Sequence, residues 1–261
     1  MPIYTADALI LRTYKLAEAD RIVVFLTSDR GKRRGVAKGA RRTRSRFTGG
    51  LEPFTQVQLA YFERENWDLV RLSYVEPVAS PLVSQSGDAL GYVSYFAELV
   101  DAWALEGDPS ERLYRLGVSV IEAITCDVPV ERVARYFEYW LLRLQGVYPS
   151  VAACQRCRGG LDHGGAVIVR DLAAFVCQKC GSDDGEVDLT GDALSFLRAA
   201  ASRSAMDMGV VPFTPDVARQ LTTVHRRLLE THLQKQLKSA RVLHELGAWT
   251  SGVRPTDRGS E

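Results

Sequence analysis

Four cysteines occur as two pairs that could bind one metal ion. Cys154 and Cys157 form the first pair and Cys177 and Cys180 the second, each with the spacing C-x2-C, and nineteen residues separate the pairs. Each C-x2-C turn can direct two thiolates at one point, and two such turns complete the tetrahedral sulfur shell that Zn2+ prefers. Because four thiolates leave no open coordination position, we expect one structural Zn2+ per chain and no catalytic metal.

Other interpretations of the cysteines remain open. The four thiols could be unligated or redox-active, and His163, which lies between the pairs, could replace one ligand. The fifth cysteine, Cys126, is expected to be a buried apolar thiol, because free cysteine is among the most buried residue types.

Residues 30–46 form a dense basic run with nine Lys and Arg residues and no acid. Such charge density is unfavourable unless a polyanion or nearby acids offset it, and Gly35 and Gly39 would let the backbone approach a phosphate closely. We predict a nucleic-acid surface here; a solvated charged surface and an acidic protein partner are the alternatives. The predicted contacts are Arg30, Lys32, Arg33, Arg34, Lys38, Arg41, Arg42, Arg44, Arg46 and Phe47.

Aromatic residues near this run could stack on bases. They are Tyr14, Phe47, Phe54, Phe62 and Trp67. Phe47 is the best candidate because Arg46 and Thr48 flank it in a polar segment, although each of these rings could equally be a core residue. Stacking on one ring contributes about 1–3 kcal/mol per base.

A second basic surface is predicted on a long helix over residues 216–241. Val217, Leu221, Val224 and Leu228 form its apolar stripe, and its cations outnumber its acids by four. The surface could hold a nucleic-acid strand or an acidic peptide; a bundle helix with a solvated face is the alternative. Its cations are Arg219, Arg226, Arg227, Lys235, Lys238 and Arg241.

The sequence lacks the common enzyme signatures, including the phosphate-binding glycine loops, the nucleophile elbow and the zinc-hydrolase and deaminase motifs. We therefore expect a binding protein and not an enzyme.

Two kinds of element must position these residues. Alternating and β-branched segments predict five short strands, at 8–14, 21–27, 32–39, 54–62 and 67–75. A longer basic link joins the third and fourth strands, which is typical of a small OB-fold barrel, although an SH3-like barrel would give nearly the same pattern. Apolar residues at 3–4 spacing then predict helices near 90–104, 113–124, 133–144, 192–201 and 216–241.

Composition places limits on the protein class. The 261 residues are 46% hydrophobic and 25% charged, which is ordinary for a globular protein. No apolar run is long enough to span a bilayer and the first residues lack an export signal, so we expect a cytoplasmic protein. The net charge of +1 hides an asymmetry, since residues 1–80 carry +5 and residues 81–261 carry −4. A basic N-terminal part favours a polyanionic partner.

Several segments together resemble a known family. They include Ala8-Leu-Ile-Leu-Arg12, Glu18-Ala-Asp-Arg-Ile-Val23, Gly35-Val-Ala-Lys-Gly-Ala-Arg-Arg42 and Leu51-Glu-Pro-Phe54, followed by Gly146-Val-Tyr-Pro149 and the cysteine pairs. This order, over about residues 5–245, resembles the bacterial DNA repair family RecO.

The resemblance implies an α+β multidomain fold: an OB-fold domain at 1–80 and a helical domain at 81–249 with a zinc knuckle insert at about 150–186. The tail at 250–261 is rich in Gly, Ser, Pro and Arg, and from this composition alone we expect it to be disordered. It implies a recombination mediator that binds single- and double-stranded DNA, anneals complementary strands and helps load recombinase onto coated single strands. The implied partners are RecR and the acidic C-terminal tail of single-stranded-DNA-binding protein, met in the cytoplasm and at the nucleoid. An OB-fold and zinc-knuckle factor that binds RNA is the main alternative; a zinc-dependent hydrolase or deaminase and a protein adaptor are the others.

Overall fold

The N-terminal part of the computed structural model is a closed five-stranded barrel. The structure describes residues 2–64, 68–83, 87–161, 164–169, 174–181, 185–233, 237, 239, 240 and 243. The barrel strands are β1 (Ile3–Leu16), β2 (Asp20–Thr27), β3 (Gly31–Ala37), β4 (Gln56–Phe62) and β5 (Val70–Ala79). They are arranged in the order β1-β2-β3-β5-β4, and β3 runs parallel to β5 while the other pairs are antiparallel. This arrangement confirms the OB-fold prediction over the SH3-like alternative.

The barrel interior follows from the period-two pattern of its strands. Inward residues such as Ile10, Val23, Val57 and Leu72 are fully buried, while alternate residues face outward. Part of the outer face is also apolar, because Leu9 of β1 and its neighbours pack against the helices.

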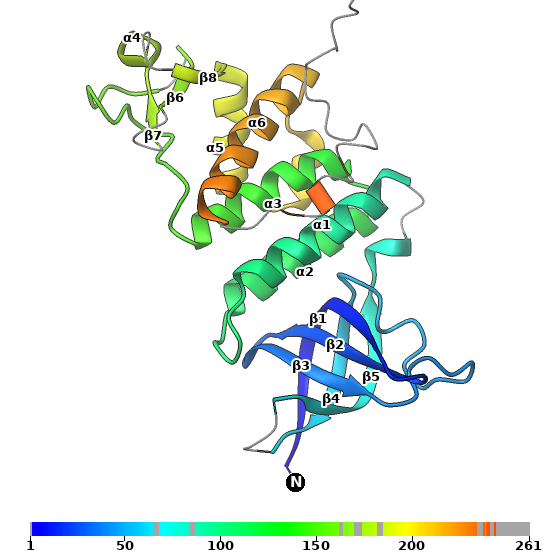
Figure 1. Cartoon of the computed structure of the whole chain (residues 1–261). Helices are drawn as coiled ribbons and strands as arrows, with labels where there is room; N and C mark the ends of the chain where they lie inside the picture. The colour runs from blue at the N-terminus through cyan, green and yellow to red at the C-terminus, as the bar shows by residue number, and fades with distance from the viewer. Residues whose placement is uncertain are drawn as a thin grey trace, which may run out of the picture.

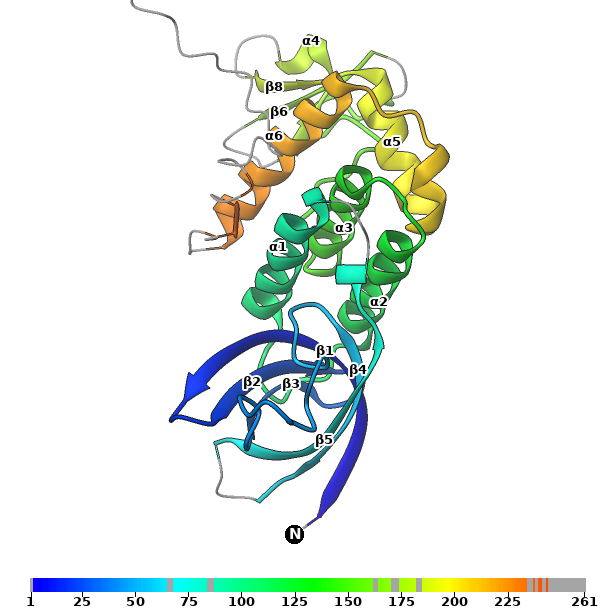
Figure 2. The same ribbon diagram turned by 90° about the vertical axis from the view of Figure 1, so that its right-hand side faces the viewer.

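The helices stack in layers above the barrel (Figures 1 and 2). They are α1 (Gly87–Trp103), α2 (Glu111–Thr125), α3 (Val130–Leu144), the short α4 (Gln178–Gly181), α5 (Gly191–Ser202) and α6 (Pro215–His232), with the 3-10 turns η1 (Pro81–Val83) and η3 (Met206–Val210). Thr190 and Thr214 cap α5 and α6 through their hydroxyls, and Pro215 occupies the first turn of α6. No helix among the described residues is both long and apolar enough to cross a membrane.

The helix predicted over 216–241 is shorter in the structure. α6 ends at His232, because Leu233 adopts an extended conformation with φ −89° and ψ 100°. The half-buried Leu233 and Leu237 then pack against the helical core, and the described residues 239, 240 and 243 are again helical. The predicted tail 250–261 lies outside the described residues.

A three-stranded sheet in the order β7-β6-β8 carries the cysteine region at the far end from the barrel (Figure 1). Its strands are β6 (Ala166–Val169), β7 (Ala174–Val176) and β8 (Gly185–Leu189). The sheet packs beside α6, which connects it to the helical core.

The barrel is fixed to the helices by main-chain bonds and by one aromatic anchor. Lys32 N–H donates to the Leu105 carbonyl (3.2 Å), and Gly107 N–H donates to the Lys32 carbonyl (3.0 Å). Phe54, from the segment between β3 and β4, packs against both Phe96 and Phe137, with ring centroids 5.5 and 6.3 Å away. Its φ of +56° is unfavourable for a residue with a side chain, and this packing holds it there.

Candidate metal centre and nucleic-acid surface

The first cysteine knuckle is shaped by main-chain hydrogen bonds. Cys154 N–H donates to the Gly159 carbonyl (2.8 Å), and Arg158 N–H donates back to the Cys154 carbonyl (2.9 Å). Arg158 has a φ of +63°, so the chain reverses tightly there. The turn directs Cys154 and Cys157 to the same side.

The second knuckle begins where β7 ends. The N–H groups of Cys180 and Gly181 both donate to the Cys177 carbonyl, at 2.9 and 3.0 Å, which forms the single turn α4. A bond from Gln155 N–H to the Phe175 carbonyl ties the two knuckles together (3.1 Å).

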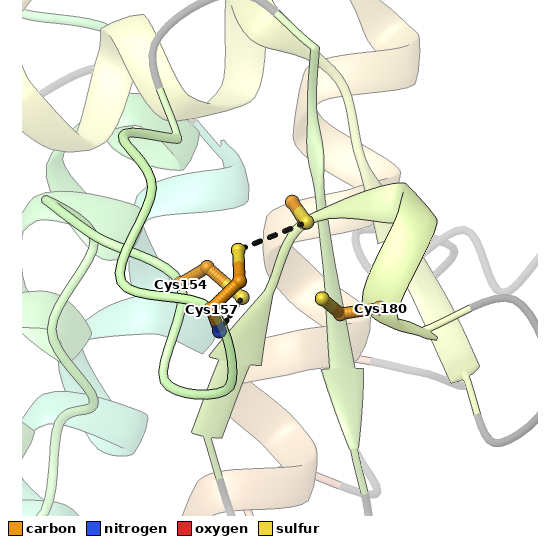
Figure 3. Close-up of side chains that lie close together, drawn as sticks. Cys154, Cys157 and Cys180 are labelled. Carbon is orange, nitrogen blue, oxygen red and sulfur yellow. Dashed lines mark hydrogen bonds between the residues drawn. The ribbon is translucent and has the colours of Figure 1, made fainter.

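The four sulfurs meet between the two knuckles, and three of the cysteines are labelled in Figure 3. All four lie within 4.8 Å of one another, and the Cys157 and Cys177 sulfurs are 3.8 Å apart. Zn–S bonds of about 2.3 Å in a tetrahedron place sulfurs about 3.8 Å apart. The cluster therefore fits a tetrahedral metal ion of that size. His163 lies outside the described residues.

The thiols are electrostatically coupled. Burial opposes ionisation of the Cys154 thiol, but N–H groups of Cys157, Cys177 and Arg156 donate to its sulfur and lower its pKa to about 6. Hydrogen bonds among the thiols, first from Cys177 and then from Cys157, raise the pKa of Cys180 to about 12. One sulfur thus ionises readily, and a bound dication would replace the protons that the others keep.

The basic run divides into two parts that differ in their partners. In the β3 part, Lys32 pairs with Asp101 (3.3 Å), Arg33 with Glu63 (3.2 Å) and Arg34 with Glu106. Their acids come from α1, the loop after α1 and the end of β4.

The cations of β3 and the neighbouring Arg30 are held by further interactions. Lys32 Nζ also donates to the Asp101 main-chain carbonyl (2.6 Å). The Arg34 guanidinium lowers the pKa of Glu106 by donating a hydrogen bond to it. Arg30, just before β3, pairs with Asp29 at 3.7 Å and lies over the Tyr4 ring. The sequence did not indicate which acids would pair with these cations. The ion pairs reduce the positive charge that the β3 part offers to a polyanion.

The other part is the loop from residue 38 to residue 46, which we call the basic loop. Its cations are Lys38, Arg41, Arg42, Arg44 and Arg46, all exposed. In the part of the chain that the structure describes, none of them has a carboxylate within ion-pair distance. Arg41 donates instead to the carbonyls of Ala17 and Glu18 in the β1–β2 turn, at 3.3 and 2.8 Å.

The structure corrects the stacking prediction for Phe47. Its ring is 2% exposed and belongs to the barrel core together with Leu51, and the Arg46 guanidinium covers it at 4.9 Å. Phe47 therefore anchors the basic loop and offers no face to a base. Phe54 is also fully buried, whereas Tyr14 is 47% exposed.

The second basic surface is weaker than its sequence indicates. Arg219 pairs with Asp216 (2.6 Å) and Arg226 lies 4.0 Å from Glu230, both on α6 itself, while Arg227 has contacts of its own. Lys235, Lys238 and Arg241 lie outside the described residues. The apolar stripe is buried, as predicted.

The burial of Cys126 was wrongly predicted, and a buried polar cluster was not predicted at all. Cys126 is exposed at the end of α2 and is not buried. Glu138 and His225 form a fully buried polar cluster with Arg135 inside the helical domain. The sequence did hold one signal for this cluster: the charged residue Glu138 follows Phe137 on the buried part of α3.

The buried cluster is closely connected. Glu138 accepts hydrogen bonds from Tyr95 and from His225 Nδ1, both at 2.8 Å, and His225 Nε2 lies 2.9 Å from the Tyr148 hydroxyl. Burial lowers the pKa of His225, although Glu138 acts against this. A neutral ring that donates from Nδ1 and accepts from Tyr148 satisfies all these groups.

Comparison with known proteins agrees with this architecture. A family model described as "Recombination protein O N terminal" matches residues 1–81, and one described as "Recombination protein O C terminal" matches residues 84–241. A protein named DNA repair protein RecO from Koribacter versatilis is 31% identical over 247 residues, which cover 92% of this chain and 98% of the relative. The RecO of Pelotomaculum thermopropionicum is 29% identical over 98% of this chain and 100% of its own. The chain therefore belongs to the recombination protein O, or RecO, family.

Proposed function

We propose that this protein is a DNA-binding recombination mediator in DNA repair. It binds single- and double-stranded DNA, promotes annealing of complementary strands and assists recombinase loading onto coated single strands. The observation that carries the proposal is the basic loop, whose five exposed cations have no acidic partner among the described residues, on an OB-fold barrel of a family whose relatives are named for DNA repair.

The proposed mechanism is electrostatic. Phosphates of one strand bind the basic loop, and release of their counterions provides most of the affinity. Once the loop has neutralised part of the phosphate charge of the first strand, the repulsion between that strand and a second strand is lower, and the two can pair. The described cations of α6, Arg219, Arg226 and Arg227, are candidates to bind that second strand, although ion pairs on α6 leave them less free charge than the basic loop has.

The four cysteines support a structural role for one Zn2+. When bound by Cys154, Cys157, Cys177 and Cys180, the ion would tie the two knuckles together through a closed sulfur shell and would supply no catalytic chemistry. We further propose that the protein is not an enzyme. Its proposed protein partners are RecR and the acidic C-terminal tail of single-stranded-DNA-binding protein, whose carboxylates complement exposed cations.

The test is a salt-titrated binding measurement on a charge-reversal variant. In Arg41→Glu, Arg42→Glu, Arg44→Glu, three loop cations become acids. Fluorescence anisotropy with labelled single strands and duplexes should show a large loss of affinity. Each lost phosphate contact lowers the salt slope by about 0.7 on single strands and about 0.9 on duplex DNA. Three contacts therefore lower it by about two on single strands and by nearly three on duplex DNA.

A second triple variant controls for net charge. Arg112, Arg115 and Arg203 are exposed on the helical domain, and changing them to Glu alters the total charge by the same amount. This control should bind DNA nearly as the unchanged protein does. Equal losses in both variants, or an unchanged loop variant with an intact fold, would contradict the proposed site. Mixing complementary labelled strands with each protein tests annealing in the same way.

A further inference from the structure

One outward face of the barrel carries an accessible apolar row. The strand register pairs Tyr14 of β1 with Ile22 of β2, and Ile22 with Val36 of β3. The neighbouring Val23 points into the barrel core, so this row faces outward. Tyr14 is 47% exposed, and Ile22 and Val36 are half-buried. An exposed aromatic ring thus ends a short apolar ledge.

Cations lie on both sides of this row. On the side nearer the helices, the register places Arg12 of β1 and Arg34 of β3 in the adjacent outward row. On the other side, Lys38 directly follows β3, and the bonds of Arg41 to the β1–β2 turn hold the basic loop against the end of the hairpin. Figure 1 shows this hairpin and the loop together at one side of the barrel.

The two cationic borders are not equivalent. Arg12 lies 3.3 Å from Asp101, and Arg34 is bonded to Glu106, so that border is already neutralised. Cations of the basic loop have no such partners within the described ranges. A polyanion would therefore place its phosphates along the loop and its less polar parts over the row of Tyr14, Ile22 and Val36.

Single-stranded nucleic acid has this combination of charged backbone and exposed flat bases. In a duplex the base faces are covered by their neighbours, so a duplex can use the phosphate border but not the aromatic ring. We propose that Tyr14 is a base-stacking residue that gives this face its preference for single-stranded over double-stranded DNA. The inference rests on the proposed DNA-binding function. It names Tyr14 as the residue that distinguishes single-stranded from double-stranded DNA.

The experiment compares Tyr14→Ala with the unchanged protein on three labelled probes of one length: an oligo-dT strand, a strand of abasic units and a duplex. Loss of stacking on one base should weaken oligo-dT binding about five- to 150-fold, which corresponds to about 1–3 kcal/mol. Binding to the abasic strand and the duplex should be unchanged. The salt slope should also be unchanged, because no cation is removed. Tyr14→Phe keeps the ring and should retain oligo-dT binding.

Tyr74 provides a matched control. It is 41% exposed on β5, where it pairs with Ala60 and its hydroxyl bonds to Glu76, so it lies beside an acid and not beside the basic loop. Tyr74→Ala should bind all three probes normally. The inference would be overturned if Tyr14→Ala weakened binding of all three probes equally, or if it did not weaken oligo-dT binding. Either result would leave the proposed DNA-binding function standing. If the unchanged protein binds none of the probes at low salt, the proposed function itself fails.

Discussion

The buried cluster on α3 makes a strong prediction about stability. Arg135 and Glu138 are both fully buried, and Arg135 Nη2 lies 3.1 Å from Glu138 Oε1. Arg135 has one well-formed hydrogen bond in the described structure, from Nη1 to Thr222 (2.8 Å). Its Nε and Nη2 make none. The guanidinium therefore depends on the nearby carboxylate charge for most of its stabilisation.

Glu138→Gln keeps the volume of the side chain but removes its charge. Breaking a buried ion pair from one side leaves an uncompensated charge and costs about 3–5 kcal/mol. A chain of this size loses about 2–4 °C of melting temperature per kcal/mol, so we expect a fall of about 6–20 °C. Calorimetry and urea unfolding at pH 7.5 would measure both quantities.

A double variant separates the charge effect from lost packing. In Arg135→Met, Glu138→Gln no buried charge remains, so much of the lost stability should return. Glu111→Gln is the surface control, because Glu111 faces Arg115 at 4.0 Å and both are largely exposed. It should change stability little. The reasoning is refuted if Glu138→Gln costs less than about 1 kcal/mol, or if the double variant is less stable than Glu138→Gln alone.

Two further predictions concern the metal and the buried histidine. Removing the proposed Zn2+ with a chelator, or changing Cys154 and Cys157 to Ser, should lower the melting temperature by about 10 °C or more. Binding of single-stranded DNA by the protein that remains folded should change little. Complete loss of DNA binding at an unchanged melting temperature would contradict the structural role. The folded-state pKa of His225 is lowered by burial, so its contribution to stability is fully present above about pH 6.5 and is lost as pH falls through the lower folded value. Urea unfolding between pH 7.5 and 5 should show stability falling by up to about 1.4 kcal/mol per pH unit, and this slope should be smaller in His225→Gln.

Features encoded by neighbouring residues could be predicted from the sequence. The C-x2-C spacing was sufficient to find the cysteine cluster that could hold a metal ion, because each knuckle is closed by main-chain bonds within a few residues. The five strands and the separate helices followed from local periodicity. The barrel type needed the parallel pairing of β3 with β5, which is a long-range contact that no local pattern contains.

Long-range pairing also explains what could not be predicted. Lys32 and Asp101 are 69 residues apart, and Arg34 and Glu106 are 72 apart. Nothing in residues 30–46 indicates that acids of the helical domain will neutralise β3 and not the basic loop. The burial of Phe47 was missed for a similar reason: its polar neighbours suggest a solvated segment, but its ring packs in the barrel core with residues far away in the sequence.

The division of the basic run has a consequence for binding. The basic loop is pinned by Phe47 and Leu51 in the barrel core, and Phe54 beyond it is held in the helical core. The backbone that carries its cations is therefore held in place at this end, so binding of a polyanion would cost less conformational entropy than binding to a free basic tail. The carboxylates that neutralise β3 confine the remaining positive charge to this pinned loop. In the proposed binding mode a polyanion would be guided to one border of the Tyr14 face, and the acids of the helical domain would influence where the strand lies without touching it.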